Sequence, residues 1–194
     1  NLQTKEYEGD NRKITVMVNL KCWRRKPSKP EFAGMVPYFK KVTISFTKLA
    51  EYLFYGCTVR PALLEEGKTT GDYFVGQQCF FVDIDGTHNV LKSRDICKEY
   101  GIDANLIYPT FHYKPSNPRH RIVFIAPEII RDAMLRDRIQ NKLIEIFRAD
   151  PSSRDRVRQF AGGEMLFYVD ERARLDVNQL LGTDFEEDGE QLVA

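Results

Sequence analysis

Apolar runs, and runs in which apolar and polar residues alternate, predict a series of short strands along the chain. β-Branched residues are concentrated in 13–20, and the unbroken apolar run at 78–83 is typical of a strand that is covered on both faces. Further strands are predicted at 106–111, 121–125, 157–161 and 165–169, with a short extended piece at 58–64. The turn-forming residues between the strands at 106–111 and 121–125 indicate a hairpin.

Helical periodicity appears between these strands. It is strongest at 127–147, where Pro127 lies near the start and apolar residues recur at helical spacing. Shorter helices are predicted from Thr43 or Ser45 to about Tyr55, from Ser93 to Tyr100 and over 177–181. The segments 26–34 and 65–76 are expected to be loops. Because strands and helices interleave, we expect an α/β (α+β) fold.

Composition narrows the class of protein without identifying it. The 194 residues suit one domain, and with 29% charged residues and a net charge of +1 a nucleic-acid site would need its own positive patch. No apolar run approaches the roughly 18 residues of a membrane span. The cysteines, Cys22, Cys57, Cys79 and Cys97, are spread singly. We therefore expect a cytoplasmic protein with reduced thiols and no membrane partner.

Two aspartates end the apolar run in CFFVDIDGTH. Asp83 and Asp85 stand at i and i+2, so on a strand their carboxylates share one face while Ile84 points into the core. Two like charges this close are costly unless a cation lies between them, and hard oxygen ligands suit Mg²⁺ or Mn²⁺. A simple turn at Asp85-Gly86, with Asp83 capping a loop, is the structural alternative, and the pair alone does not decide between them.

The same motif resembles the hhhDxDGT signature of haloacid-dehalogenase-type phosphatases. That resemblance implies Asp83 as the phosphoryl acceptor, Asp85 as acid and base, and a late acidic pair that completes a Mg²⁺ site. Here the late acids Glu186, Glu187 and Asp188 follow no apolar strand, and about eighty residues precede the acid strand. Both features weigh against a phosphatase.

Other stretches support a different family. Thr110-Phe111-His112 is followed by PRHRIVF and, after the long predicted helix, by ADPSSRDRVRQFAGG. With FFVDIDG, these stretches span about 79–163 and resemble the archaeo-eukaryotic primase superfamily, in particular the primase-polymerase domains of plasmid, phage and mobile-element replication proteins. The resemblance implies one catalytic domain, with a palm similar to an RNA-recognition motif at about 78–181, an N-terminal α/β module at about 1–77, and the active site in the cleft between them. Residues 182–194 would be an acidic tail or linker.

The resemblance also implies a set of metal ligands. Asp83, Asp85 and a third carboxylate would hold two Mg²⁺ or Mn²⁺ ions, one lowering the pKa of a primer 3′-hydroxyl and the other bridging the triphosphate. Asp150 is the first choice for the third ligand, Asp155 the second and Asp170 the third. For each of them a turn residue is the structural alternative.

Several basic residues are candidates for phosphate contacts. His112 matches the family's histidine that touches the incoming nucleotide. Arg119 and Arg121 share one face of a predicted strand and His120 lies on the other, and Arg121 is the better triphosphate ligand because a guanidinium forms forked hydrogen bonds to phosphate. Lys114, Arg154 and Arg158 are further candidates for phosphate or template contacts, although solvated surface charges explain each of them as well.

These residues predict a template-dependent nucleotidyltransferase, a DNA primase/polymerase that joins nucleoside triphosphates on single-stranded DNA. A fused or separate helicase is an expected partner. Two alternatives stay open: a replication-initiation module that binds nucleic acid without catalysis, and the phosphatase. Metal-dependent nucleotide incorporation distinguishes the polymerase from the non-catalytic module. Hydrolysis of an aryl phosphate that depends on Asp83 tests the phosphatase alternative.

Overall fold

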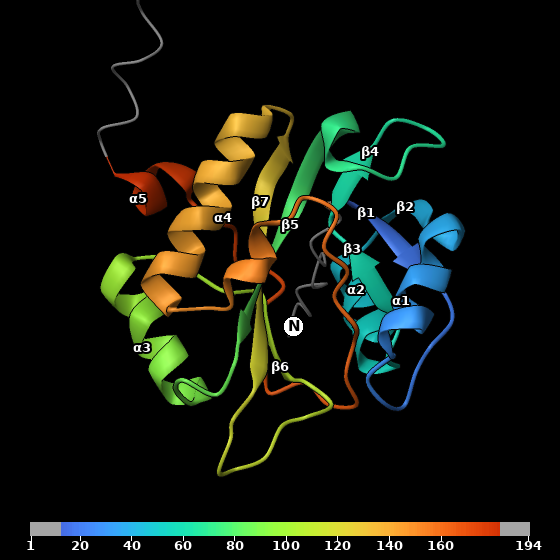
Figure 1. Ribbon diagram of the computed structural model, residues 1–194. Coiled ribbons are helices and arrows are strands. Elements are labelled where there is room, and N and C mark those ends of the chain that lie inside the picture. Colours follow the sequence, from blue (N-terminus) through green and yellow to red (C-terminus); the bar gives the residue numbers. More distant parts are fainter. Residues whose placement is uncertain (1–12, 183–194) are drawn as a thin grey trace, which may run out of the picture.

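The computed structural model describes residues 13–182, which form a mixed α/β fold with two antiparallel sheets (Figure 1). The smaller sheet contains, in spatial order, β2 (Lys40–Ile44), β1 (Ile14–Asn19) and β3 (Thr58–Arg60). The larger sheet contains β4 (Ala62–Leu64), β5 (Phe74–Ile84), β7 (His120–Ile130), β6 (Leu106–Pro109) and β8 (Tyr168–Val169). The predicted fold class is confirmed.

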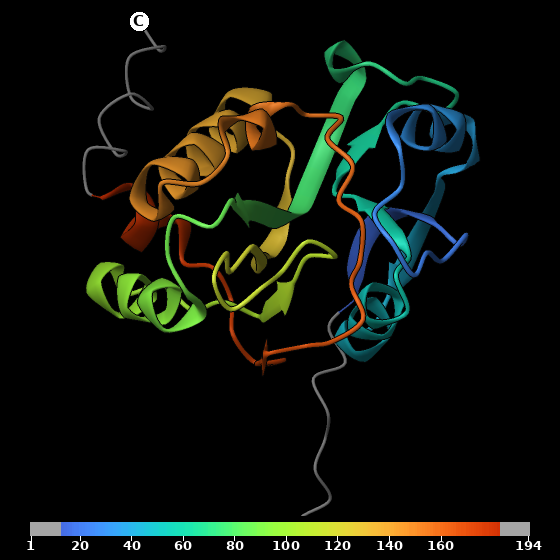
Figure 2. The ribbon, with the colours of Figure 1, turned by 60° about the horizontal axis from the view of Figure 1, so that its bottom comes forward.

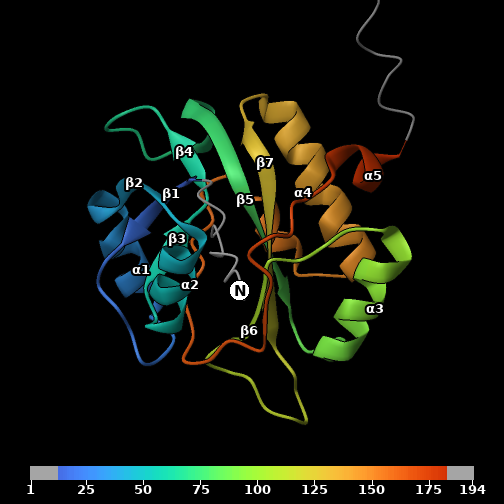
Figure 3. The same cartoon turned by 180° about the vertical axis from the view of Figure 1, so that it is seen from behind.

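Helices cover the face of the larger sheet that points away from the smaller sheet, and other helices lie beside the smaller sheet, as Figures 1 and 3 show from opposite directions. They are α1 (Lys29–Met35), α2 (Phe46–Phe54), α3 (Val90–Tyr100), α4 (Ala133–Phe147) and α5 (Val177–Leu181). Short 3₁₀ turns occupy Val36–Tyr38, Gly71–Tyr73 and Pro151–Arg154. Side chains cap the helices in the usual way: Ser45 precedes α2, Asn89 precedes α3, and Asp176 precedes α5. No helix of the described range is both long and apolar enough to cross a membrane.

Strand β5 separates two hydrophobic cores. Phe80, Val82 and Ile84 pack with the side of α3, α4 and α5, whereas Cys79 and Phe81 pack with the smaller sheet and α2. This arrangement confirms the prediction of a strand covered on both faces. Because side chains alternate along a strand, Asp83 lies on the face of Phe81, toward the smaller sheet.

The centre of the larger sheet is a split β-α-β unit. β5 and β6 run parallel, and β7 lies between them, antiparallel to both. The chain after α4 does not add a strand beside β5, because β4 already occupies that edge. Instead it runs along the boundary between the two halves, where Phe160 and Val59 exchange backbone hydrogen bonds (Figure 2).

The helix predicted at 127–147 begins later than expected. β7 continues to Ile130, which pairs with Gln77 after a register shift, and α4 starts after Asp132, whose carboxylate accepts from the N–H groups of Met134 and Leu135. Pro127 fits in the strand because pairing of β6 with β7 does not extend beyond Val123. Tertiary pairing therefore overrides the helical periodicity over 127–132.

Four other predictions are wrong in part. The predicted loop at 26–34 contains α1, and the predicted loop at 65–76 ends in a 3₁₀ turn and the start of β5. The expected strands at 157–161 and 165–169 shrink to the Phe160 bridge and to β8. The reason is that 157–163 bonds to the other half of the molecule: Gly162 donates to the Cys57 carbonyl and Gly163 to the Leu53 carbonyl.

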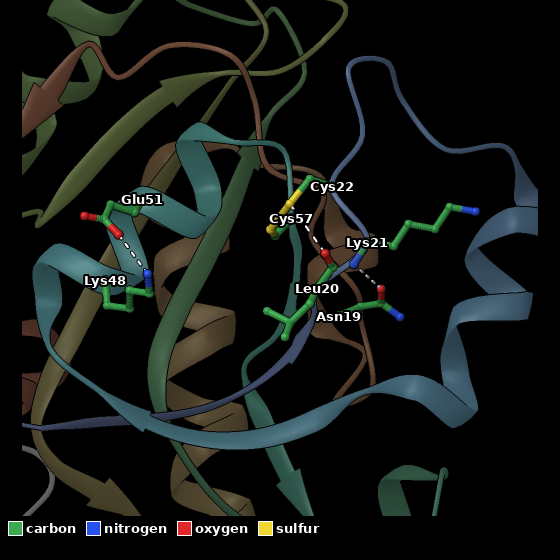
Figure 4. The surroundings of a disulfide bond; sticks show 7 residues. All are labelled: Asn19, Leu20, Lys21, Cys22, Lys48, Glu51 and Cys57. Carbon is green, nitrogen blue, oxygen red and sulfur yellow. Dashed lines mark hydrogen bonds and ion pairs between the residues drawn. A yellow bond between two sulfur atoms is a disulfide. The ribbon is translucent and has the colours of Figure 1, made fainter.

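The expectation of four reduced thiols is also wrong, because Cys22 and Cys57 form a disulfide (Figure 4). A backbone hydrogen bond from Trp23 to the Gly56 carbonyl, 3.0 Å long, holds the two segments together. Cys79 and Cys97 are free and buried, and burial raises the pKa of the Cys97 thiol to about 12. The acidic tail or linker expected at 182–194 lies, apart from Gly182, outside the described residues.

Candidate active site

A cavity of about 510 Å³ opens between the two halves of the molecule. Its walls come from the segment around the start of α1, the end of β5, the connection from β6 to β7, and the chain after α4. The acidic residues of its lining are Asp83, Asp85, Asp150 and Asp155, and the basic ones are Lys26, Lys29, His112, Arg119, Arg121 and Arg158. Both kinds of charge therefore face one space.

The acid pair meets two arginines at the start of β7. Asp83 and Arg121 are register partners across β5 and β7 and form an ion pair in which both side chains are nearly buried. The Arg158 guanidinium lies 3.8 Å from the other oxygen of Asp83. Asp85, more exposed, has its Oδ1 3.0 Å from Arg119 Nε. Carboxylates and guanidinium groups thus face each other at the strand ends. Arg119 and Arg121 both line the cavity, which agrees with the predicted shared face.

Arg121 is fixed on more than one side. Besides Asp83, its guanidinium donates to the Ala161 carbonyl, which also accepts from the Tyr108 hydroxyl at 3.0 Å. Burial by itself would lower the pKa of Arg121, but the Asp83 charge and Tyr108 raise it above its usual value. Burial raises the pKa of Tyr108 to about 12, so this hydroxyl stays a donor.

Two of the three choices for a third carboxylate lie at the cavity. Asp150 donates its backbone N–H to the Asp83 carbonyl at 2.8 Å. Burial opposes its ionisation, yet the hydrogen bonds from Ser152 and the charges of Arg158 and Lys26 lower its pKa overall. Asp155 also faces the cavity.

Asp170, in contrast, lies at the far end of β6. Its backbone donates to the Asn105 carbonyl, and its carboxylate accepts from the N–H groups of Arg172 and Ala173. The structure therefore brings Asp150 and Asp155 to the acid pair and leaves Asp170 apart.

The predicted basic residues divide in the same way. His112 is exposed at the rim, and its backbone N–H donates to Thr110 Oγ1 at 3.3 Å. Lys114 instead forms a backbone bridge with Asn117 in the turn between β6 and β7. Arg154 is the last residue of a 3₁₀ turn, and its backbone carbonyl accepts a hydrogen bond from Arg136. Neither Lys114 nor Arg154 lines the cavity.

Sequence reasoning missed one wall of the cavity. Lys26, Lys29 and Phe32 line it, and Gln159 joins Phe32 to the opposite side by donating to its carbonyl at 3.3 Å. A local signal was present in the sequence, because Ser28 and Glu31 form a capping box at the start of α1. The periodic pattern is too short there to reveal the helix.

A chain of hydrogen bonds supports the two arginines from behind. His120 is buried, and its Nδ1 lies 2.7 Å from the Pro118 carbonyl, so Nδ1 must be the donor and Nε2 of the neutral ring must accept from Ser93 Oγ at 2.7 Å. Ser93 has then used its proton and accepts from His88 Nε2 at 2.9 Å. This network ties the loop after Asp85 to the start of β7.

The cavity acids fit a divalent cation by their chemistry. Hard oxygen donors from Asp83, Asp85 and Asp150 face one space, and arginines balance the charge of the first two, as an acid pair of this kind requires. In the arrangement described here, over residues 13–182, no three His, Cys, Asp or Glu side chains are gathered around a common point. A cation bound by Asp83 and Asp85 would therefore replace the guanidinium groups of Arg121 and Arg119 as the partners of these carboxylates.

The cavity also has capacity for an anion. Arg158 Nε is buried and has no hydrogen-bond partner among the described residues, and Arg119 Nε, although 3.0 Å from Asp85 Oδ1, forms no aligned hydrogen bond with it. Buried donors are normally paired, so these two groups are suited to an acceptor such as a phosphate oxygen. Carboxylate oxygens and guanidinium donors therefore face the same cavity.

Comparison with known proteins adds little to this geometry. No model of a known protein family matches the chain, and no curated protein matches it. Among solved structures, the chain is similar to the AEP domain of the primase-polymerase (PrimPol) of cyanophage S-2L, with a TM-score of 0.48, 11% identity and 89% of each chain covered. A likeness of this size carries no argument about activity, so the functional proposal rests on the cavity itself.

Proposed function

We propose that this chain is a nucleotidyltransferase of the primase-polymerase type, which joins nucleoside triphosphates on a single-stranded DNA template. One observation carries the proposal: Asp83 and Asp85 share a cavity with Arg121, at the start of the neighbouring strand, and with Arg119, which lies just before that strand, and each acid forms an ion pair with one of these arginines. Nucleotidyl transfer needs oxygen ligands for cations beside donors for a triphosphate. The cavity volume also lies within the roughly 300–1,000 Å³ that small-molecule sites occupy.

The carboxylates have the role of cation ligands in this proposal. Asp83, Asp85 and Asp150 would hold Mg²⁺ or Mn²⁺, with Asp155 as the alternative to Asp150. Bound ions of this kind polarise phosphoryl oxygens and stabilise the negative charge that develops during transfer.

The basic residues have the role of triphosphate ligands. Arg121 and Arg119 offer guanidinium groups whose present acceptors are the two acids, and Arg158 adds an unpaired Nε. His112, at the rim, is placed to contact phosphate as well. Fixed donors of this kind need no reorganisation when charge develops, which is how electrostatic stabilisation lowers a barrier.

Extension of a labelled primer on a single-stranded template tests the proposal, with deoxyribonucleotides and ribonucleotides in separate reactions and Mg²⁺ or Mn²⁺ present. The near-isosteric variant D83N/D85N is expected to lose at least about 100-fold in incorporation, because removal of a key charge-stabilising group costs 10²–10³ in rate. D170N is the matched control, since Asp170 also follows a strand but lies away from the cavity, and its activity should be unchanged.

Unchanged extension by D83N/D85N would overturn the catalytic role of the pair. A wild-type protein that binds template but incorporates no nucleotide with either ion would instead be the non-catalytic replication module.

A further inference from the structure

The segment 21–29, KCWRRKPSK, concentrates positive charge in a chain that is nearly neutral overall. Its cations are Lys21, Arg24, Arg25, Lys26 and Lys29, and it contains no acid. Among the described residues, acids neutralise only Arg25 of these five, through a two-pronged ion pair with Glu31 at 2.8 and 2.6 Å. The other four have no ion pair within residues 13–182. We call 21–29 the basic segment.

We propose that the basic segment, together with the exposed end of α2 at Phe54 and Tyr55, is a docking surface for single-stranded nucleic acid that leads into the cavity. Binding of a single strand at this surface does not depend on the proposed function. The role of that binding, which is to deliver a template to the acid pair, does rest on it. Three further observations support it.

The backbone of the basic segment is held in one shape. Lys21 donates its N–H to Asn19 Oδ1 at 2.9 Å, Trp23 donates to the Gly56 carbonyl, and Cys22 is bonded to Cys57. A side chain at Gly56 would put its Cβ 1.9 Å from the Trp23 carbonyl oxygen, so the two segments lie in close contact. A preformed surface loses less conformational entropy when it binds.

Aromatic groups are interleaved with these charges. Lys21 Nζ and the Arg25 guanidinium lie 4.4 and 5.1 Å from the centre of the Trp23 ring. Tyr55 is 65% exposed and Phe54 43%, and they precede Gly56 directly. Figure 4 shows Lys21 extended away from the disulfide. Cations that contact phosphates, beside rings on which bases stack, are the combination that single strands require.

The docking surface is continuous with the cavity. Lys26 and Lys29, at its end, line the cavity wall that faces Asp83 and Arg158. The Lys26 charge is also among those that lower the pKa of Asp150. A strand lying along the basic segment would therefore be led toward the acid pair.

The observations favour a single strand over a duplex. Exposed rings can stack only on bases that are not already stacked in a helix, whereas duplex DNA is held mainly through its phosphates. The shared chemistry is a single-stranded phosphodiester chain, so DNA and RNA are separate arms of the test.

Fluorescence anisotropy of labelled dT20, U20 and a 20-base-pair duplex, measured without nucleotides or metal ions, tests the surface. K21Q/R24Q is expected to bind the preferred single strand at least about fivefold more weakly, with a salt slope reduced by about 1.4, because each phosphate contact contributes about 0.7. Y55A should also weaken binding at least about fivefold through lost stacking. K92Q/K98Q, two exposed charges on α3 on the far side of the larger sheet (Figure 1), is the matched control and should bind like the wild type.

The outcomes separate the docking surface from the proposed activity. Wild-type affinity in both K21Q/R24Q and Y55A overturns the surface even if primer extension is intact, as does a wild-type protein that binds the duplex as tightly as either single strand. Weaker binding in both variants, with no extension by the wild type under any condition, leaves the surface standing and overturns the activity.

Discussion

Asp83 and Arg121 stand opposite each other on β5 and β7 and form a nearly buried ion pair at the inner wall of the cavity. The charges of both groups are balanced inside the protein, and the pair has further contacts to Arg158 and to the Ala161 carbonyl. The residues proposed to bind cation and triphosphate are therefore also partners of one another within the fold.

Replacement of Arg121 by Met tests this double role. The substitution leaves the Asp83 charge buried without its main partner, which typically costs about 3–5 kcal/mol in the free energy of unfolding. R119M removes the more exposed pair with Asp85 and should cost less than about 1 kcal/mol. Urea denaturation measures both.

The double variant R121M/D83N supplies the control for this prediction. Removal of the orphaned charge should recover part of the loss, so the double variant is expected to be more stable than R121M. If the losses in free energy of unfolding of R121M and D83N add up to the loss of the double variant, the ion pair does not couple the two residues.

Gly86 follows Asp85 directly and has a backbone conformation that favours glycine. Its φ is +82°, and a Cβ there would lie 2.0 Å from Asn117 Oδ1. Gly67 also has a positive φ, +73°, but nothing lies within 4 Å of a Cβ added to it. We expect G67A to cost about 1 kcal/mol from backbone strain alone and G86A to cost more, with a fall in primer extension that G67A does not show. Equal costs and equal activities would contradict the proposed steric contact.

Ser93 joins the loop after Asp85 to the start of β7 through two histidines. S93A leaves His120 Nε2 buried without a donor, and we expect a loss of about 1–3 kcal/mol. S152A, an exposed serine near the cavity, should change the free energy of unfolding by less than about 0.5 kcal/mol. If the network positions Arg119 and Arg121, S93A should also raise the KM for nucleotide with a smaller change in kcat. A loss of stability without a change in KM would make Ser93 purely structural.

The histidines predict a pH dependence of stability. Burial, together with the charges of His120, Lys92 and Arg148, lowers the pKa of His88 to about 4, and burial lowers that of His120 despite its bond to Pro118. The unfolded chain then binds more protons than the folded one between about pH 4 and the ordinary histidine pKa of about 6.5. Stability should therefore fall as the pH drops from about 6.5 toward 4.

Urea midpoints at several pH values between 7 and 4.5 measure this effect. H88N should flatten the slope, whereas H112N, a change at the exposed rim, should keep it. A slope that is the same in H88N and in the wild type would show that other groups cause it.

Much of the cavity could be predicted from the sequence, because its signals are local. The alternation of a strand places Asp83 and Asp85 on one face and separates Arg119 and Arg121 from His120, and the structure has both arrangements. The apolar run before Asp83 likewise predicts a strand covered on both sides, since it has no polar face to expose.

The rest depended on contacts between residues far apart in the sequence. Pairing of Gln77 with Ile130 keeps 127–130 in a strand although its periodicity suits a helix. The edge beside β5 was open to either the end of the chain or β4, and no local pattern decides that choice. Lys26 and Lys29 reach the cavity where the carbonyl of Phe32 in α1 accepts from Gln159, and Cys22 meets Cys57 where Trp23 bonds to Gly56. The sequence by itself determined which residues share a face of a strand, because side-chain direction alternates along the backbone. The tertiary structure decided which faces meet, because that depends on the packing of segments distant in the chain.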